Sequence, residues 1–467
     1  MLLIDRDSKK QIYLQIYEYY RERILSGEIS ADSPLPSTRS LAGELSVSRN
    51  TVETAYQQLL AEGYLYSRQG SGYYISKVER LAPAAAKNTV RRKNAGVAED
   101  RKERSNVKYD FKYGRLAPDS FPLKIWKRLT NKVLLDISPE ALTSYANRTG
   151  EPRLKREIAK YIFESRNVDC AADQVVLCSG LMTVIDMISQ LFKDGSESVA
   201  VEEPCYDIVR QIFRRHGYEI EPIPLHEDGI DIEALYESRA KLIYITPSHQ
   251  FPMGSVMSVN NRIRLIQWAR ERDAYIIEDD YDSEYRYNSR PLPSLQSLDN
   301  QDRVIYINTF SKSLAPALRM DYMVLPPLLK ARYDSELAHY GCNVPAVTQQ
   351  VLAEFMAAGH WQRHIRRIAS DNKKLHDLLV SEIHRQLGDG VDICGNNAGL
   401  HFILQVHNGM DEEQLIAAAE KNGVGVYPVM PYYSSPPAER NRVLIGFGGF
   451  EAKDIPESIG LLKKAWF

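Results

Sequence analysis

The stretch "NTFSKSLAPALRMDY", residues 308–322, places Lys312 between two short apolar segments. The segment "RVIYINTF" (303–310) runs into it, and "DYMVLPP" (321–327) leads out of it. Both segments have the length and the content of β-branched and aromatic residues that buried strands have. The stretch therefore predicts a sheet in which the connection between two strands holds a lysine.

Similar segments recur through the second part of the chain. From about residue 109, strand-like runs alternate with amphipathic stretches typical of helices, and the other runs are "QVVLCSG", "ESVAVEEP", "AKLIYITP" and "AYIIEDD". This alternation predicts an α/β domain with a mainly parallel or mixed sheet. A long helical stretch after about residue 345 leads into "GLHFILQV" and "RVLIGFGGF", which predict a smaller α+β lobe over about 345–467.

Composition narrows the class of protein. The length of 467 residues predicts two or three domains, and a net charge of −2 gives no general attraction to nucleic acid. Five scattered cysteines without a Cys-x-x-Cys pair indicate a reducing compartment, with neither a disulfide framework nor a metal site expected. The N-terminus lacks the apolar core of a signal peptide, and no apolar run approaches the roughly 20 residues that span a bilayer. We expect a cytoplasmic protein with no membrane contact.

Three blocks follow from these patterns, so the expected protein is multi-domain. Residues 1–76 are rich in helix signals. Residues 77–108 contain no aromatic residue and are dominated by alanine, asparagine, lysine and arginine, which predicts a flexible basic linker. Residues 109–467 carry the α/β alternation.

The first block has the pattern of two helices followed by a hairpin. In "SVSRNTVETAYQQLLAEGY" (46–64), apolar residues fall at i, i+3, i+4, i+7 and i+8 from Val52, so one helix face packs inward. "PSTRSLAGEL" (36–45) supplies a preceding helix, and "YLYSRQGSGYYIS" (64–76) alternates as a hairpin does. Residues at the helix starts and the hairpin tip are the candidate DNA contacts: Arg39, Ser48, Arg49, Asn50, Thr51, Arg68, Gly70 and Gly72. The alternative is a helical packing module whose arginines are only solvated.

This block resembles the winged helix-turn-helix of the GntR superfamily over nearly its whole length, through "PLPSTRSLAGELSVSRNTVETAYQQLLAEGYLYSRQGSGYYIS". In that family, the positions that match Arg39, Arg49, Thr51 and Gly72 contact or approach DNA. The resemblance implies that the block binds double-stranded promoter DNA.

The third block holds the groups that an imine-forming lysine needs. Pyridoxal 5′-phosphate (PLP) is the common aldehyde partner of such an amine; it requires a carboxylate at its ring nitrogen, cations and amides at its phosphate, and a packed ring face. Asp279, at the carboxyl end of "AYIIEDD", is the candidate for the ring nitrogen. The other candidates are Ser311, Arg319, Gly180, Leu181 and Met182 near the phosphate, Tyr281 and His249 (or Gln250) at the ring oxygen, and Tyr206 on the ring face. Taken singly, each such residue is more often a solvated, turn or core residue.

In their order along the chain, these residues resemble fold-type-I enzymes related to aspartate aminotransferase, over essentially all of 109–467. A GntR-type head joined by a linker to such a body is the arrangement of the MocR/GabR family of bacterial transcription regulators, whose signatures resemble "TPSHQFPMG", "IIEDDYDSEY" and "TFSKSLAPALR". The expected fold is a helical winged helix-turn-helix with a β-wing, plus an α/β body of the PLP-dependent aminotransferase fold type I with a smaller α+β lobe. The resemblance implies that Lys312 forms a Schiff base with PLP and that the chain is a homodimer, with or without swapped heads.

The resemblance further implies that the aminotransferase-like body acts as a sensor and not as an enzyme. Amino-acid-sensing relatives carry an arginine for the ligand carboxylate in the segment that resembles "RVLIGFGGF" (442–450), where this chain has no cation after Arg442. The GabR type carries another just after the stacking tyrosine, whereas Asp207 and Ile208 follow Tyr206 here. Arg115 or Arg210 could supply an anchor from elsewhere.

Three hypotheses about the ligand stay open. The departures favour the PdxR-like branch, which senses PLP itself and controls vitamin B6 (PLP) synthesis genes. The first alternative is a regulator that senses an amino compound, such as D-Ala-D-Ala, GABA or taurine, through an external aldimine with PLP. The second alternative is an active aminotransferase, and a sensor could also keep residual transaminase activity.

Overall fold

The computed structural model describes residues 2–8, 10–78, 107–145, 147–193, 197–287 and 293–467. The chain divides into two compact units, Met1–Lys102 and Glu103–Phe467, which we call the head and the body. The predicted linker over 77–108 falls almost wholly on 79–106, outside the described residues. Within the described ranges, every helix is too short or too polar to cross a membrane.

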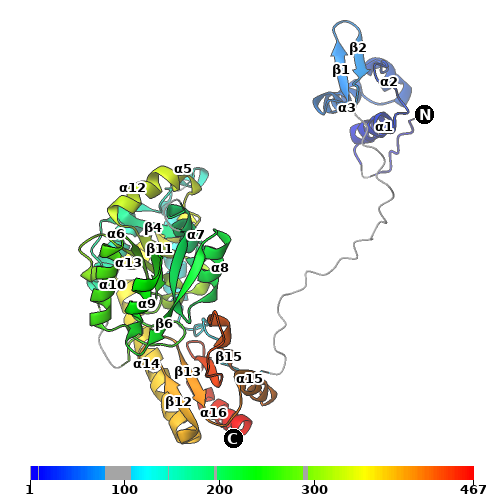
Figure 1. The fold of residues 1–467 in the computed structure, drawn as a ribbon. Helices are drawn as coiled ribbons and strands as arrows, with labels where there is room; N and C mark the ends of the chain where they lie inside the picture. The colour runs from blue at the N-terminus through cyan, green and yellow to red at the C-terminus, as the bar shows by residue number, and fades with distance from the viewer. Residues whose placement is uncertain (1, 9, 79–106, 146, 194–196, 288–292) are drawn as a thin grey trace. The chain divides into compact units, whose positions relative to one another are not determined.

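The head contains three helices and a two-stranded hairpin: α1 (Ile12–Ser26), α2 (Thr38–Leu45), α3 (Arg49–Ala61), β1 (Leu65–Arg68) and β2 (Gly72–Ile75). All five elements contribute to one core, which includes Ile16, Leu41, Val52, Leu65 and Ile75. Ser37 and Ser48 cap the second and third helices, because each hydroxyl accepts a hydrogen bond from an amide of the first turn. The antiparallel hairpin extends beside the helices (Figure 1) and completes the predicted winged helix-turn-helix.

An eight-stranded mixed sheet forms the centre of the body, in the order β4-β11-β10-β9-β8-β5-β6-β7. Its strands are β4 (Val175–Cys178), β5 (Ser198–Glu203), β6 (Glu219–His226), β7 (Gly229–Ile230), β8 (Leu242–Ile245), β9 (Tyr275–Asp279), β10 (Val304–Thr309) and β11 (Asp321–Val324). The run from β10 to β6 is parallel, whereas β11 is antiparallel to both β10 and β4, and β7 is antiparallel to β6. The carboxyl ends of β8, β9 and β10 therefore meet at one edge of the sheet.

Helices cover both faces of this sheet. Ile305 and Ile307 of β10 pack on the side of α7 (Leu181–Leu191), α8 (Asp207–Arg215) and α12 (Pro327–Glu336). Tyr306 packs on the opposite side, with α4 (Leu123–Asp136), α6 (Pro152–Arg166) and α13 (Ala346–Ala357). Val304 shares that side with α9 (Ile232–Glu237) and α10 (Val259–Glu271). Because successive side chains of a strand point to opposite faces, a strand covered on both sides is apolar throughout.

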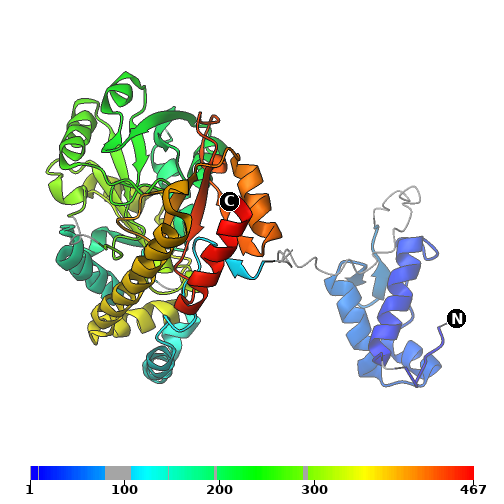
Figure 2. The same ribbon diagram turned by 90° about the horizontal axis from the view of Figure 1, so that it is seen from below.

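A smaller lobe lies at one end of the body, coloured orange to red in Figures 1 and 2. Its four-stranded sheet has the order β12-β13-β16-β15. The strands are β12 (Val391–Cys394), β13 (His401–Val406), β15 (Tyr427–Pro428) and β16 (Arg442–Gly446), and α14 (His360–Leu387), α15 (Glu412–Lys421) and α16 (Ile455–Trp466) pack with them. β3 (Tyr109–Asp110) pairs with β14 (Val424–Gly425), so the first residues of the body join this lobe.

The long helical stretch expected after residue 345 is two helices. Gly359 lies between α13 and α14 with φ +67°, in the left-handed region that glycine adopts without steric cost. The first of the two helices packs against α4 and α6 of the larger layer, and the second carries core residues of the smaller lobe. Two short helices, α5 (Pro139–Thr143) and α11 (Phe310–Ser313), complete the set of α-helices among the described residues.

Candidate functional site

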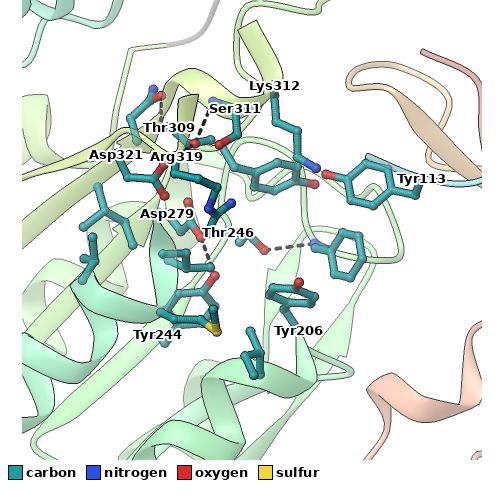
Figure 3. A pocket seen from close by; sticks show the side chains of 18 residues that line it. Tyr113, Tyr206, Tyr244, Thr246, Asp279, Thr309, Ser311, Lys312, Arg319 and Asp321 are labelled. Carbon is teal, nitrogen blue, oxygen red and sulfur yellow. Dashed lines mark hydrogen bonds between the residues drawn. The ribbon is translucent and has the colours of Figure 1, made fainter. Parts of the chain in front are cut away.

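A cavity of about 320 Å³ opens at the carboxyl ends of β8, β9 and β10 (Figure 3). Ligands of open α/β sheets bind at such an edge. Of the predicted cofactor residues, only Gly180, His249 and its alternative Gln250 are absent from its lining. The lining residues used below are Tyr113, Leu181, Met182, Tyr206, Tyr244, Phe251, Asp279, Tyr281, Thr309, Ser311, Lys312, Arg319 and Asp321.

Lys312 lies in the single turn of α11, directly after β10. Its backbone is fixed from two sides: the Tyr285 hydroxyl donates to the Lys312 carbonyl over 2.8 Å, and His364 Nε2 lies 2.8 Å from the carbonyl of Ser313. The Lys312 Nζ atom lies 3.9 Å from the centre of the Tyr113 ring, and Figure 3 shows the side chain directed toward that ring. Burial lowers the pKa of Lys312 to about 8, so an appreciable fraction of the amine is unprotonated near neutral pH and able to act as a nucleophile.

Asp279 is the last residue of β9 and is 5 % exposed. Its Oδ2 atom accepts a hydrogen bond of 2.5 Å from the hydroxyl of Tyr244, which comes from the neighbouring strand β8. Burial raises the pKa of the carboxyl to about 8, although the Tyr244 bond acts in the opposite direction. Within the described part of the chain, no cationic side chain forms an ion pair with this carboxylate. A protonated ring nitrogen is the kind of partner that would offset the cost of its burial.

Gly180 and Arg319 meet at the start of α7. Gly180 precedes the helix with φ +89°, and a β-carbon at this position would overlap the Arg319 Nη2 atom. Arg319 itself has φ +47°, a left-handed conformation that non-glycine residues rarely adopt and that often marks a functional site. The glycine therefore allows a guanidinium to lie against the free amides of a helix start, which together attract anions.

Ser311 adds an unpaired donor to the same cavity. Its Oγ atom is buried and has no hydrogen-bond partner among the described residues. A buried hydroxyl without a partner is costly in a folded protein, so such a group commonly awaits a ligand. The group is available for an anionic oxygen.

Aromatic rings form the wall of the cavity. Tyr206, 39 % exposed, lies at its open side and makes an edge contact with Phe251, with ring centres 5.4 Å apart. Tyr281 is buried and donates its hydroxyl to the backbone carbonyl of His249 over 2.9 Å. Leu181 and Met182 contribute apolar side chains where α7 begins. A flat aromatic ligand would therefore find packed faces in this cavity.

His249 lies behind Tyr281 and not in the cavity lining. Its Nδ1 atom lies 2.9 Å from Asp282 Oδ2 and 3.1 Å from the Tyr281 hydroxyl. Gln250 also points away, because its amide donates to the carbonyls of Pro204 and Phe251. His249, Asp282 and His401 offer ligand atoms within 4.8 Å of one another, but the first two already bond to each other. This cluster supports the position of Tyr281.

Sequence reasoning missed Tyr113, Tyr244 and Asp321. Tyr244 belongs to the apolar run "AKLIYITP", in which a tyrosine is indistinguishable from a core residue. Tyr113 comes from the start of the body, about 200 residues before Lys312. Of these three residues, only Asp321 could have been noticed in the sequence. It is a carboxylate two residues after the arginine that is the candidate for the phosphate, and a negative charge there would repel a phosphate.

The two other arginines considered as anchors are bonded elsewhere. Arg210 is 2 % exposed, and its guanidinium donates to Asp207, to Ser434 and to the carbonyl of Pro431. Arg115 pairs with Asp110 over 2.9 Å and does not line the cavity.

In the head, the candidate DNA contacts lie at the places that the sequence predicts. Ser48 caps α3, and Arg49 follows it with a side chain that is 66 % exposed and 4.0 Å from Glu53. Arg39 and Asn50 are exposed in the first turns of α2 and α3, and Thr51 donates its amide to Ser48. The turn of the wing uses Gly70 and Gly72, with φ +76° and +98°, and Arg68 stacks on Tyr74 with its guanidinium carbon 4.5 Å from the ring centre. The head thus presents polar and basic groups at a helix start and a wing tip.

Two family models match this chain. The model described as "Bacterial regulatory proteins, gntR family" matches residues 12–75. The model described as "Aminotransferase class I and II" matches residues 117–447. The first covers the head and the second most of the body.

Characterised and uncharacterised regulators are similar to the chain along its whole length. It is 39 % identical to "Uncharacterized HTH-type transcriptional regulator YdeL" of Bacillus subtilis, over 97 % of this chain and 96 % of that protein. It is 35 % identical to "Probable rhizopine catabolism regulatory protein MocR" of Rhizobium meliloti, over 100 % and 96 %. It is 29 % identical to "HTH-type pyridoxine biosynthesis transcriptional regulator PdxR" of Corynebacterium glutamicum, over 94 % and 92 %.

Among solved structures, the body is similar to aminotransferases. The crystal structure of multiple substrate aminotransferase (MsAT) from Thermococcus profundus superimposes with a TM-score of 0.69 and 25 % identity, and the match covers 78 % of this chain and 91 % of that one. The likeness confirms the predicted fold of the body.

Proposed function

Because this chain belongs to the MocR family of transcriptional regulators, in which a GntR-type DNA-binding head precedes an aminotransferase-like body, we propose that its cavity binds PLP and that PLP is itself the effector. The genes it controls would then be those of vitamin B6 synthesis. The relative PdxR, a regulator named for pyridoxine biosynthesis, supports this choice.

The cavity residues fit the parts of PLP. Asp279 would hold the ring nitrogen, since it is a buried carboxylate without a cationic partner among the described residues. Arg319, the start of α7 and the unpaired Ser311 hydroxyl would hold the phosphate. Tyr206 would pack on the ring, and Lys312 would carry the cofactor covalently. When bound, PLP supplies an aldehyde carbon to which a primary amine can add with loss of water.

The observation that carries the choice of effector is the absence of a carboxylate anchor. In the lining of the described cavity, Lys312 and Arg319 are the only cationic side chains. Arg210 and Arg115 are held by carboxylates elsewhere. The glycines of the segment 446–449 leave little room for an arginine in their place: a β-carbon at Gly446 would overlap the backbone of Tyr113, and β-carbons at Gly448 and Gly449 would lie 3.0 Å and 2.8 Å from atoms of Arg115.

The energetic consequence separates PLP from amino acids. A bidentate arginine bond to a ligand carboxylate is worth about 2–5 kcal/mol in a buried site, much of it because the carboxylate is otherwise left unpaired. An α-amino acid would lose this contribution here, because the lining holds no cationic side chain besides Lys312 and Arg319. PLP has no carboxylate, so its ring does not leave a carboxylate unpaired in the cavity.

An amino compound without a carboxylate is the second candidate effector. The lowered pKa of Lys312 favours it, because a free amine is the group that can exchange with another amine on a bound aldehyde. The exposed positions of Tyr206 and Met182 leave the cavity open to such a compound. Turnover of an amino compound with a keto acid would instead indicate an aminotransferase.

Helix-turn-helix heads read paired half-sites on DNA when two copies act together. Exposed apolar side chains, including Leu134, Leu135 and Tyr145, give the body a surface that a second copy could cover. We propose a homodimer in which PLP in the body changes the separation or orientation of two heads on paired half-sites.

The test is an electrophoretic shift of the DNA upstream of this protein's own gene. Protein freed of PLP and protein loaded with PLP should bind with different affinities, and Lys312→Ala should behave as the free form under both conditions. D-Ala-D-Ala, GABA and taurine, each added with PLP, are the comparison ligands. An unchanged shift with PLP, together with a changed shift with one of these compounds, would assign the second candidate effector instead.

A further inference from the structure

Asp321 projects into the end of the cavity where an anion would bind. It is the first residue of β11 and is 4 % exposed. In the strand register it lies opposite Thr309 of β10 on one side and opposite Cys178 of β4 on the other. The chain continues from Cys178 through Gly180 into α7, so the carboxylate stands beside the start of that helix.

The groups that would hold a phosphate already act on this carboxylate. The Thr309 hydroxyl donates to Asp321 Oδ1 over 2.7 Å, as Figure 3 shows. The Leu181 amide at the helix start and the Arg319 guanidinium both lower the pKa of Asp321. A helix start and an arginine are the usual partners of a ligand phosphate. Here Leu181, Arg319 and the carboxylate of Asp321 all line the same cavity.

We propose that Asp321 is a specificity-determining residue: its carboxylate takes the place of a ligand anion between the start of α7 and Arg319, and therefore competes with the phosphate of PLP. This inference rests on the proposed binding of PLP. It makes the binding of a phosphorylated ligand weak and reversible, as a sensor of free PLP requires. A vitamer that lacks the phosphate is not subject to the competition.

Counting charges supports the competition. The cavity lining holds two cationic side chains, Lys312 and Arg319, and two carboxylates, Asp279 and Asp321. A phosphate monoester brings a charge of about −1.5 to −2 near neutral pH. With Asp321 ionised, Arg319 is shared between two anions, and like charges at short range disfavour each other. Removing the Asp321 charge leaves the guanidinium to the ligand alone.

The competition depends on pH. Burial raises the pKa of Asp321 to about 6, while Thr309 and Arg319 act in the opposite direction. The titratable groups that face it are Lys312 and Arg319, which lower its pKa, together with Asp279 and Cys178, whose pKa values it raises. Above about pH 6 the carboxylate is ionised and competes; below that pH it is neutral and can donate to a phosphate oxygen. The advantage of removing it is therefore large at alkaline pH and small at acid pH.

The experiment compares the full-length protein with Asp321→Asn and Asp321→Ala. The asparagine keeps an acceptor for the Thr309 hydroxyl and is therefore the variant expected to preserve the fold. Thermal unfolding of both variants checks that they are folded. Asp302→Asn, in an exposed loop, removes one negative charge far from the cavity and is the control. Equilibrium titrations with PLP and with pyridoxal are followed by visible absorbance, and borohydride reduction followed by mass measurement counts the molecules fixed at Lys312.

We expect Asp321→Asn to bind PLP at least about tenfold more tightly than the wild type at about pH 8, and the gain to shrink below about threefold near pH 5.5. Because the ratio of variant to wild type is used, the titration of the phosphate itself cancels. Asp321 also raises the pKa of Lys312, and pyridoxal, which reacts with the same amine, reports that effect separately. The affinity for pyridoxal should change by less than about twofold, since it carries no phosphate. Asp302→Asn should match the wild type.

Equal PLP affinities of wild type and Asp321→Asn at both pH values would overturn this inference and leave the proposed function in place. Gains of equal size for PLP and pyridoxal would also overturn it, because they would indicate a general effect on the pocket. If neither protein is labelled by PLP, both this inference and the proposed cofactor are wrong.

Discussion

The Tyr244 hydroxyl donates a hydrogen bond of 2.5 Å to Asp279 Oδ2, and both side chains are buried where two parallel strands end side by side. This bond stabilises the ionised carboxylate against the effect of burial, which raises the pKa of Asp279 to about 8. Tyr244→Phe should therefore raise that pKa further and weaken PLP binding about tenfold, since a hydrogen bond to a charged group contributes about 1.5–3 kcal/mol.

The measurement is a PLP titration at neutral pH, followed by visible absorbance. Tyr236→Phe, which removes a hydroxyl bonded to Glu271 on the surface, is the control and should not change the affinity. Wild-type affinity in Tyr244→Phe would show that Asp279 does not need its ionised form to bind the ligand.

The reaction of Lys312 with PLP should accelerate as the pH rises. Burial lowers the pKa of this amine to about 8, so the protonated form dominates below that value and the reactive free amine above it. Each unit of pH below the pKa reduces the free amine about tenfold. The rate of borohydride-trapped labelling, measured by mass, should increase up to about pH 8 and then level off. Lys312→Arg keeps a positive charge and should remain unlabelled at every pH; labelling of this variant would place the reactive amine elsewhere.

Ser311→Ala should have opposite effects on stability and on binding. The Ser311 Oγ atom is buried without a partner among the described residues, so its removal should leave the ligand-free protein unchanged or more stable by up to about 1 kcal/mol. PLP affinity should fall about three- to tenfold, because a phosphate donor is lost. Ser313→Ala is the matched control: that hydroxyl contacts the carbonyl of Thr309 and does not line the cavity. Denaturant unfolding of both variants measures the effect on stability, and PLP titration measures the effect on binding. An equal loss of PLP affinity in the two variants would count against Ser311 as a phosphate donor.

Arg210→Ala should destabilise the body and should not remove a binding contact to a ligand. The buried guanidinium donates to Asp207 of its own helix and to Ser434 and the Pro431 carbonyl of a distant segment. Removing it leaves these acceptors unpaired, at a cost of about 2–4 kcal/mol in the free energy of unfolding. Arg215→Ala, on the exposed face of the same helix, should cost less than about 0.5 kcal/mol. If Arg210→Ala instead has the wild-type free energy of unfolding and its DNA binding no longer responds to a carboxylate-bearing ligand, the guanidinium is an anchor for that ligand.

Arg49→Ala should weaken DNA binding and leave the PLP absorbance unchanged. The side chain is 66 % exposed in the first turn of α3, and its ion pair with Glu53 is long and solvated. Loss of one phosphate contact should reduce the slope of log affinity against log salt by about one. Lys10→Ala removes a basic residue that pairs with Glu18 on the same head and is the control. Fluorescence anisotropy over a range of salt concentrations provides both slopes, and identical slopes for the wild type and Arg49→Ala would exclude this arginine from the interface.

The periodicity of apolar residues in the sequence predicts most of the fold. The segments that alternate between strand and helix patterns are the strands and helices of the body, and the helix–helix–wing order of the head is present as expected. Those patterns are local, because the burial of a strand on both faces or of a helix on one face is written into neighbouring residues. The helical stretch predicted after residue 345 is present as two helices, and the break between them at Gly359 was not predicted: α13 packs on the larger layer, and α14 carries core residues of the smaller lobe.

The order of the chemical groups can be read from the sequence alone: a glycine before a helix, a carboxylate after a strand, and a lysine followed seven residues later by an arginine. In an α/β sheet, the carboxyl ends of parallel strands meet at one edge, and groups that follow those strands therefore lie close together in a site. Which further side chains reach that site depends on the packing of segments that are distant in the chain. Tyr113 and Tyr244 join it and His249 does not, because these positions depend on strand register and on contacts between segments far apart in the chain. The same register sets Asp321 beside Cys178 and the start of α7, which is why an acid can compete with a phosphate there.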